Sequence, residues 1–215
     1  MAEIELVTGH AGTGHVSSDD ARHLNAGIFG AGTYFLGNAP EISMASANVV
    51  QIANCEIMAQ GAHVRITDGP LELAVANGTP GYHRKDLICL SYSKDSVTAV
   101  EDSDFIVIEG DPAMTAEGAK DPTDEWMQNS ILENDLLVHI PIGRITFDGL
   151  TPSVAAIIGE ASSISKLGDS ILQANQNLCN GRLNFTWGEN HGKYGLTIYI
   201  GDVEVGFIKQ GTQLL

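Results

Sequence analysis

The sequence has few basic residues and no long apolar run. Only 11 lysines and arginines stand against 27 aspartates and glutamates in 215 residues, so the formal net charge is −16. Such a negative field repels nucleic acid and anionic membrane surfaces. No apolar run approaches the 18 residues or so of a membrane-spanning helix. We therefore expect no nucleic-acid partner and no membrane insertion, whereas a bound cation or a basic protein partner is compatible with the charge.

The N-terminus and the cysteines lack export and cross-linking signals. The opening residues, MAEIELVTGHAG, do not show the basic start and apolar stretch of a secretory signal. Cys55, Cys89 and Cys179 are isolated and form no C-x-x-C pair. An odd number of widely spaced cysteines argues against a disulfide framework and against a zinc site. We expect reduced thiols in a protein made in a cytoplasm.

Familiar catalytic motifs are also missing. The run GHAGTGH at residues 9–15 lacks the Lys-Ser/Thr ending of a phosphate-binding loop, and neither G-x-S-x-G nor H-E-x-x-H occurs. His10, His15, Asp19 and His23 have the spacing of no standard metal site. We predict no catalytic residue, no cofactor and no metal ion, and a protein that is not an enzyme.

Short apolar or alternating runs fill most of the chain from Glu41 to Phe147. They recur about every ten residues and are separated by turn signals such as Asn77-Gly78. This spacing predicts a mainly β fold, with a sandwich or barrel-like domain over residues 1–150. Seven glycines between Gly9 and Gly37 predict a long structured loop before the strands.

A heptad pattern follows this β-rich region. Thr151-Pro152 is typical of a helix start, and apolar residues recur every seven positions with smaller residues between them. We therefore predict a short heptad helix as a helical connector over residues 151–178. Its apolar side either packs on the chain's own domain or forms an oligomer interface. The interface interpretation uses Ile157, Ala161, Ile164, Ile171 and Leu178.

Residues 179–215 return to β character and predict a small β-hairpin domain. Most of the aromatic residues of this segment, among them Phe185, Trp187 and Tyr194, lie close together in the sequence. Two interpretations stay open. These aromatic side chains form the core of the hairpins, or Trp187, His191 and Tyr194 form a contact surface for a receptor or partner.

Several segments resemble the baseplate and tail-fibre structural proteins of phages and prophages, found mainly in Gram-positive bacteria. The most specific is residues 11–36, AGTGHVSSDDARHLNAGIFGAGTYFL. The likeness continues in residues 58–66, from Asn77-Gly78 through residues 84–88, and in residues 107–112, and it covers about residues 5–150.

This resemblance implies an N-terminal domain that docks into the tail and a C-terminal region that trimerises, connects to fibre parts or contacts the host. It names no catalytic residues. We expect a structural component of the virion, made in the bacterial cytoplasm, with other tail and baseplate proteins as partners. The short C-terminal segment favours a homotrimeric adaptor. The alternative is a carbohydrate-binding receptor module that recognises a host surface glycan through the C-terminal aromatic residues.

Overall fold

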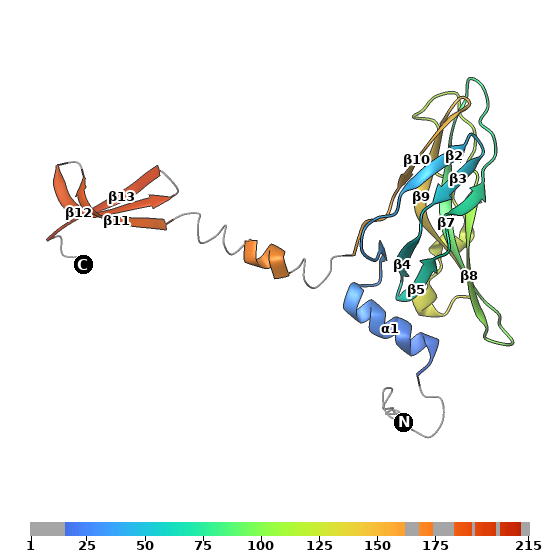
Figure 1. Cartoon of the computed structure of the whole chain (residues 1–215), viewed down its shortest axis with the longest axis horizontal. Helices are drawn as coiled ribbons and strands as arrows, with labels where there is room; N and C mark the ends of the chain where they lie inside the picture. Colours follow the sequence, from blue (N-terminus) through green and yellow to red (C-terminus); the bar gives the residue numbers. More distant parts are fainter. Residues whose placement is uncertain (1–15, 162–167, 174–182, 191, 201–202, 212–215) are drawn as a thin grey trace. The chain divides into compact units, whose positions relative to one another are not determined.

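Strands dominate the part of the chain that the structure describes, as the sequence predicted. The computed structural model describes residues 16–161, 168–173, 183–190, 192–200 and 203–211. The chain divides into two compact units, Met1–Ala161 and Ser162–Leu215. Figure 1 labels most of the helices and strands of both units.

The first unit is built around a four-stranded antiparallel sheet. Its strands are β7 (His83–Lys94), β8 (Glu101–Ile108), β9 (Leu137–Asp148) and β10 (Thr151–Ala156), in the order β10-β9-β7-β8. Strand β7 is buried almost continuously, because both faces of the sheet are covered there. A strand covered on both faces needs apolar side chains at consecutive positions, which explains the run from Leu87 to Leu90.

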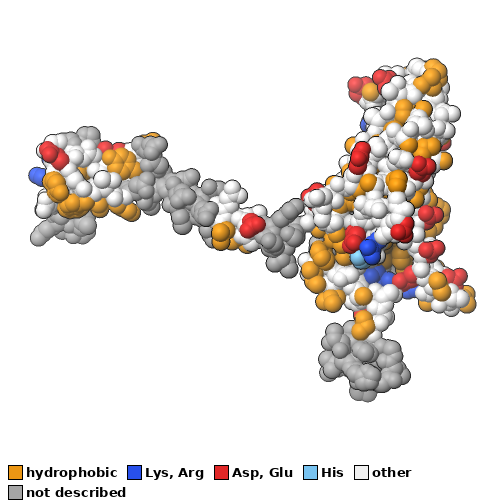
Figure 2. Space-filling model, viewed as in Figure 1, with side chains coloured by type: hydrophobic (Ala, Val, Ile, Leu, Met, Phe, Trp, Pro, Cys, Tyr) orange, Lys and Arg blue, Asp and Glu red, His pale blue; other side chains and the backbone are white. Residues whose placement is uncertain are grey.

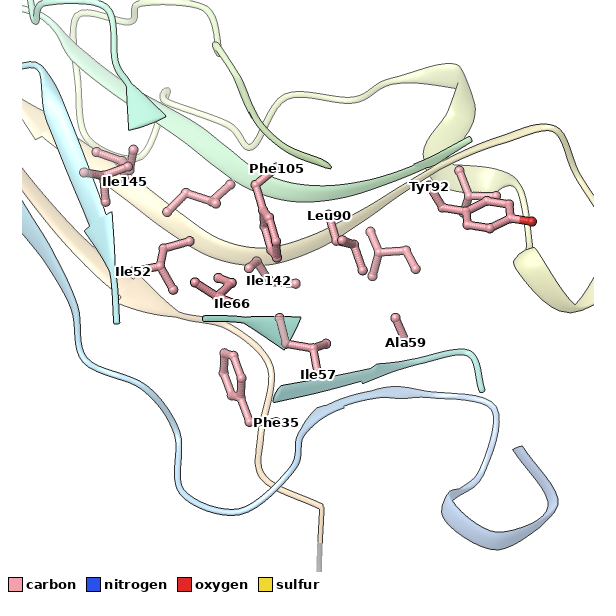
Figure 3. Packing of buried hydrophobic residues seen from close by; sticks show 14 of the residues in the cluster. Phe35, Ile52, Ile57, Ala59, Ile66, Leu90, Tyr92, Phe105, Ile142 and Ile145 are labelled. Atoms are coloured by element: carbon pink, nitrogen blue, oxygen red, sulfur yellow. The ribbon is translucent and has the colours of Figure 1, made fainter. Parts of the chain in front are cut away.

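Two three-stranded sheets form the second layer. One contains β1 (Thr33–Phe35), β4 (Cys55–Ala59) and β5 (Ala62–Ile66), and the other contains β2 (Ile42–Ser46), β3 (Val49–Ile52) and β6 (Leu71–Ala74). Side chains from both layers meet in one core, as Figure 3 shows for Phe35, Ile57 and Leu90. β10 contacts β2 and β8 contacts β6, so the sandwich closes at both edges in a barrel-like way.

A bulge in the central strand β9 keeps its apolar residues on the core. Cys89 pairs with Pro141 while the preceding Ile88 pairs with Gly143, so Ile142 is the extra residue. Proline lacks the N–H that a ladder needs and is therefore confined to such irregular positions within sheets. The bulge shifts the alternation, and Ile140 and Ile145 consequently both face the core.

The loop predicted between Gly9 and Gly37 is wrong for residues 18–29, which form helix α1 (Ser18–Phe29). Ser17 and Asp20 form a capping box: the Asp20 N–H donates to Ser17 Oγ at 3.1 Å, and the Ser17 N–H donates to Asp20 Oδ2 at 2.9 Å. Of the glycines that suggested a loop, only Gly27 lies within the helix.

The predicted boundary at residue 150 and the helix start at Thr151 are also wrong. Residues 151–156 form β10, which pairs with β9 through Thr151↔Asp148 to Ala156↔Gly143. Pro152 fits here because β10 is an edge strand, where a missing N–H costs no ladder bond. The first unit continues to Ala161, whose N–H donates to the Phe35 carbonyl at 2.8 Å.

Of two short 3₁₀ helices, η1 (Glu125–Gln128) packs on β9, whereas η2 (Ile131–Glu133) contacts α1 and places Ile131 in the core. In the second unit, β11 (Leu183–Asn190), β12 (Lys193–Ile200) and β13 (Val203–Lys209) form an antiparallel sheet in chain order. Residues 168–173 are helical. The expected small C-terminal β segment is therefore present.

We predict that Gly61→Ala destabilises the first unit more than Gly37→Ala. Both glycines have positive φ, +84° and +87°, but a Cβ at Gly61 would lie 2.1 Å from the Arg22 carbonyl oxygen, whereas one at Gly37 would meet nothing within 4 Å. Positive φ costs an alanine about 1–2 kcal/mol, and forced overpacking adds about 1–3 kcal/mol. Urea unfolding followed by circular dichroism measures both; equal losses would show that α1 does not pack on this turn.

Candidate interaction surfaces

Arg22 anchors helix α1 to the sandwich. Its side chain is buried, and Nη1 donates to both carboxylate oxygens of Glu101, at 2.9 and 2.8 Å. The guanidinium also lies 5.9 Å from the centre of the Tyr92 ring. One turn later, Asn25 Nδ2 donates to the Gly61 carbonyl at 2.9 Å. The side of α1 that carries these residues therefore faces the β4–β5 turn and the start of β8.

This anchor changes the acidity of its members. Burial raises the pKa of Glu101, but hydrogen bonds led by the one from Arg22 outweigh it, and the net pKa lies below the usual 4.5. Burial, assisted by the neighbouring Glu101 carboxylate, raises the pKa of Tyr92 to about 12. At neutral pH the cluster therefore holds an ionised glutamate and a protonated tyrosine.

The opposite side of α1 presents apolar residues to solvent. Leu24 and Ile28 are 62% and 59% exposed, and they lie four residues apart, so they share one side of the helix. Ala21 precedes Leu24 by three residues and is also exposed. We call Ala21, Leu24 and Ile28 the α1 surface. A lone exposed leucine is ordinary, but an apolar stripe on an anchored helix is a candidate contact for a partner.

Arg84 and Asp86 form a buried ion pair at the opposite end of β7 from this helix. Arg84 Nε lies 2.8 Å from Asp86 Oδ1, and Nη2 lies 3.0 Å from Oδ2. Asp86 is fully buried and also accepts a hydrogen bond from the Gly110 N–H at 3.0 Å. The guanidinium stacks on the Phe147 ring at 4.5 Å.

The remaining donors of Arg84 hold two loops. They reach the carbonyl oxygens of Ala76 at 2.7 Å and Asn77 at 3.1 Å, and the Glu109 carboxylate at 2.9 Å. The arginine therefore joins the loop after β6 to the loop after β8. Since every donor of Arg84 is directed at these groups, we interpret the pair as structural rather than as a substrate site.

His139 is a second buried polar group, and it lies beneath η1. Its Nδ1 lies 3.3 Å from Asp124 Oδ2, and its ring meets the Trp126 ring edge-on at 5.2 Å. Asp124 also caps η1, accepting from the Trp126 N–H at 2.8 Å. Burial raises the pKa of the nearby Cys89 thiol to about 12, so it stays protonated at neutral pH.

The described residues contain no cluster of three or more histidine, cysteine, aspartate or glutamate side chains arranged to hold a metal ion. Cys55 and Cys89 are free thiols, while Cys179 lies outside the described residues. Of the histidines considered as metal ligands, His10 and His15 also lie outside the described residues, and His23 contacts Asp19 at 3.7 Å on α1.

Among the described helices, none is long and apolar enough to cross a membrane.

The sheet of the second unit has two different faces. Residues directly opposite each other in antiparallel strands share a face. Phe185 pairs with Ile198, Trp187 with Leu196, and Leu196 with Ile208, so these side chains share one face. Tyr194 belongs to it too, because its ring meets the Trp187 ring edge-on at 6.1 Å. The apolar sheet face consists of Phe185, Trp187, Tyr194, Leu196, Ile198 and Ile208.

The other face of this sheet, which we call the polar face, carries a hydrogen-bonded polar cluster beside Tyr199 and Phe207. Asn190 Nδ2 donates to Thr197 Oγ1 at 3.0 Å and to the Glu204 carboxylate at 2.9 Å. Thr197 is buried there. On the apolar sheet face, by contrast, Phe185, Trp187 and Tyr194 are 60%, 55% and 52% exposed. Within the described strands of the second unit, these aromatic side chains therefore form no closed hairpin core.

The predicted oligomer interface is not assembled as a continuous helix. Ile157 follows β10 outside any helix, and Ala161 belongs to the bridge between residues 159–161 and Phe35. Ile171 lies in the helical stretch 168–173 and is exposed. Ile164, Leu178 and His191 lie outside the described residues. Of the predicted contact residues, the structure brings together only Trp187 and Tyr194.

We predict that Arg84→Met lowers the free energy of unfolding by about 3–5 kcal/mol, because it strands the charge of Asp86 in the interior. The matched control is Arg144→Met, which breaks an ion pair with Asp121 whose two side chains are each more than one third exposed. That change should cost about 1 kcal/mol or less. Urea titrations measure both, and a loss at Arg84 no larger than that at Arg144 would refute the structural role.

We predict that Glu101 contributes to acid sensitivity. Its folded-state pKa is lowered, so its contribution to stability is complete above the unfolded pKa near 4.5 and is lost as the pH falls through the folded pKa. Glu101→Gln should therefore be less stable than the wild type at pH 7 and lose less stability below about pH 4.5. Thermal melts at a series of pH values test this, with the exposed Glu133→Gln as control; parallel wild-type and Glu101→Gln profiles would contradict it.

Comparison of the chain with models of known protein families finds no matching family. A search of curated proteins likewise finds no match. Any statement about function therefore depends on the residues and their arrangement.

Proposed function

We propose that the chain is a non-catalytic structural adaptor of a phage tail, with other baseplate or fibre proteins as its neighbours in the virion. The observation that carries this proposal is the distribution of exposed apolar side chains. Single exposed apolar residues are scattered over the first unit, but Leu24 and Ile28 form a stripe on one side of α1, and the apolar sheet face of the second unit carries Phe185, Trp187 and Tyr194. A protein with one apolar contact surface on each of two units can join two partners.

The resemblance to tail and baseplate proteins supports the same role for the first unit. Its separate segments meet at two contacts. Arg22 from the first segment packs on Gly61 from the second. Arg84 from the third contacts Glu109 from the fourth, and it also donates to the Asn77 carbonyl at the start of its own segment. The segments that carry the likeness thus build one scaffold, which would hold α1 ready to dock into the tail.

The assembly we propose contains several copies, and a homotrimer remains the expected number because tail parts surround a symmetry axis. The chain would be made in the bacterial cytoplasm and incorporated into the virion there. The strong negative charge would keep free copies soluble before assembly.

A carbohydrate-binding module is the second candidate, and the exposed Trp187 and Tyr194 favour it. Sugar sites, however, combine aromatic stacking with several convergent polar groups. Glu189, opposite Tyr194 at one end of the strands, is the polar residue that the described register adds to this face. Loss of glycan-array binding in a Trp187→Ala variant would be needed to prefer this function.

We predict that Leu24→Glu blocks incorporation of the chain into tails without unfolding it. Leu24 is exposed, so a carboxylate is tolerated in the free protein, but burying that charge against a partner is unfavourable. The matched control is Met114→Glu, at an exposed apolar residue in the loop after β8. Each variant is expressed in place of the wild type, and the particles are then purified. They should contain Leu24→Glu at one tenth or less, roughly, of the amount found for Met114→Glu or the wild type.

Immunogold electron microscopy with antibodies to the first unit locates the protein in the same particles. Label at one end of the tail, present for the wild type and Met114→Glu and lost for Leu24→Glu, is the expected result. Wild-type protein that is abundant in the cell yet absent from purified particles would contradict the tail proposal. Equal incorporation of all three proteins would contradict docking through α1.

A further inference from the structure

We infer that the apolar sheet face of the second unit packs against the same face of other copies of this chain, around the axis of the assembly. The inference deepens the proposed function and rests on it insofar as that function requires several copies. It assigns the contact between copies to the sheet of β11, β12 and β13 rather than to a heptad helix that begins at Thr151. The argument proceeds from exposure, size and charge.

The described strands of the second unit leave this face open. Phe185, Trp187 and Tyr194 expose half or more of their surface, and Leu196, Ile198 and Ile208 lie between them and are half-buried. Figure 2 shows hydrophobic side chains gathered along one side of this unit. A sheet that is apolar on one face is stable when another layer covers that face.

The size of the face indicates how strongly it binds. Three strands of seven or eight residues span about 26 Å by 14 Å, which is on the order of 400 Å². A patch of this size is as large as the largest exposed apolar patch on a typical monomer. Two such faces together bury less than the roughly 1,200 Å² of the smallest stable complexes, so we expect micromolar association.

The charge distribution favours a second copy of the chain as the partner that covers this face. The first unit contains 7 basic and 23 acidic residues, so it carries the whole net charge of −16. The second unit contains four basic and four acidic residues and is neutral. Acidic side chains accordingly spread over the visible side of the first unit (Figure 2). Copies of the first unit repel each other, whereas copies of the second unit can approach without electrostatic cost.

The chemistry of the face is also self-complementary. Its centre carries no ionised side chain, since Glu189 stands at the end of β11 where it pairs with Tyr194. A second apolar sheet face therefore buries no unpaired charge. A strongly charged partner would gain nothing from it, and a sugar would find few hydrogen-bonding groups on it.

The test compares adjacent residues on opposite faces of β11 in the full-length chain. Phe185→Glu places a carboxylate on the apolar sheet face, and Thr186→Glu places the same group on the polar face, where Thr186 is exposed. Sedimentation velocity between about 1 and 100 µM covers the range expected for a small interface. We expect wild type and Thr186→Glu to associate and Phe185→Glu to stay a single copy with an unchanged circular dichroism spectrum.

A second measurement keeps the inference testable if Phe185→Glu misfolds. In a Trp126→Phe background, Trp187 is the sole tryptophan, since the chain has two. Its fluorescence should move to shorter wavelength as the concentration rises, and salt should strengthen association by screening the first units. A wild type that stays a single copy with solvent-exposed Trp187 overturns the inference, as does association that survives Phe185→Glu.

These outcomes are separate from those that test the tail proposal. If Phe185→Glu is a folded single copy but still enters particles, self-association through the sheet is upheld and is dispensable for incorporation. If the wild type is a single copy in solution but present in particles, the inference fails while the tail proposal stands. Glycan binding by a wild type that remains a single copy would assign the face to sugar and overturn the inference.

Discussion

Asp86 is fully buried on β7, and a negative charge in that position is tolerated only because Arg84 and the Gly110 N–H surround it. The same arginine reaches the backbone after β6, stacks on Phe147 of β9 and contacts Glu109 after β8. Four strands are therefore held together at one end of the sandwich by one ion pair. The second anchor, Arg22 on Glu101, fixes α1 near the other end of β7 and β8. With both ends fixed by charge, the aliphatic core between them can pack without a disulfide.

This division of charge and apolar surface gives each unit a different task. Five of the seven basic side chains of the first unit form ion pairs within it, and much of its acidic surface faces solvent. Copies of the first unit therefore repel each other, and its α1 surface is left for contact with another protein. The second unit is neutral and leaves one sheet face open. An adaptor that meets a foreign partner with one unit and its own copies with the other follows from that distribution.

The sequence predicted the mainly β fold because period-two runs and turn residues are local signals. It missed α1, although Ser17 and Asp20 carry a readable capping box, since the surrounding glycines outweighed that signal. It misassigned residues 151–156 because Thr-Pro fits both a helix start and an edge strand, and only pairing with β9 decides between them. Of the contact residues, Trp187 and Tyr194 were found by residue type, whereas Phe185 and Ile208 join them only through strand register. Glu109 and Phe147, which Arg84 contacts, lie 25 and 63 residues further along the sequence, so no local pattern reveals these contacts.

The measurement that most directly tests this division of tasks is the mass of each unit after cleavage of the assembled protein. A specific protease site inserted between residues 161 and 162, at the boundary of the two units, allows both products to be weighed by native mass spectrometry. The account predicts that the product containing β1 to β10 is a single copy and that the product containing β11 to β13 is a multimer. A first unit that stays multimeric, or a second unit that is a single copy, would contradict it.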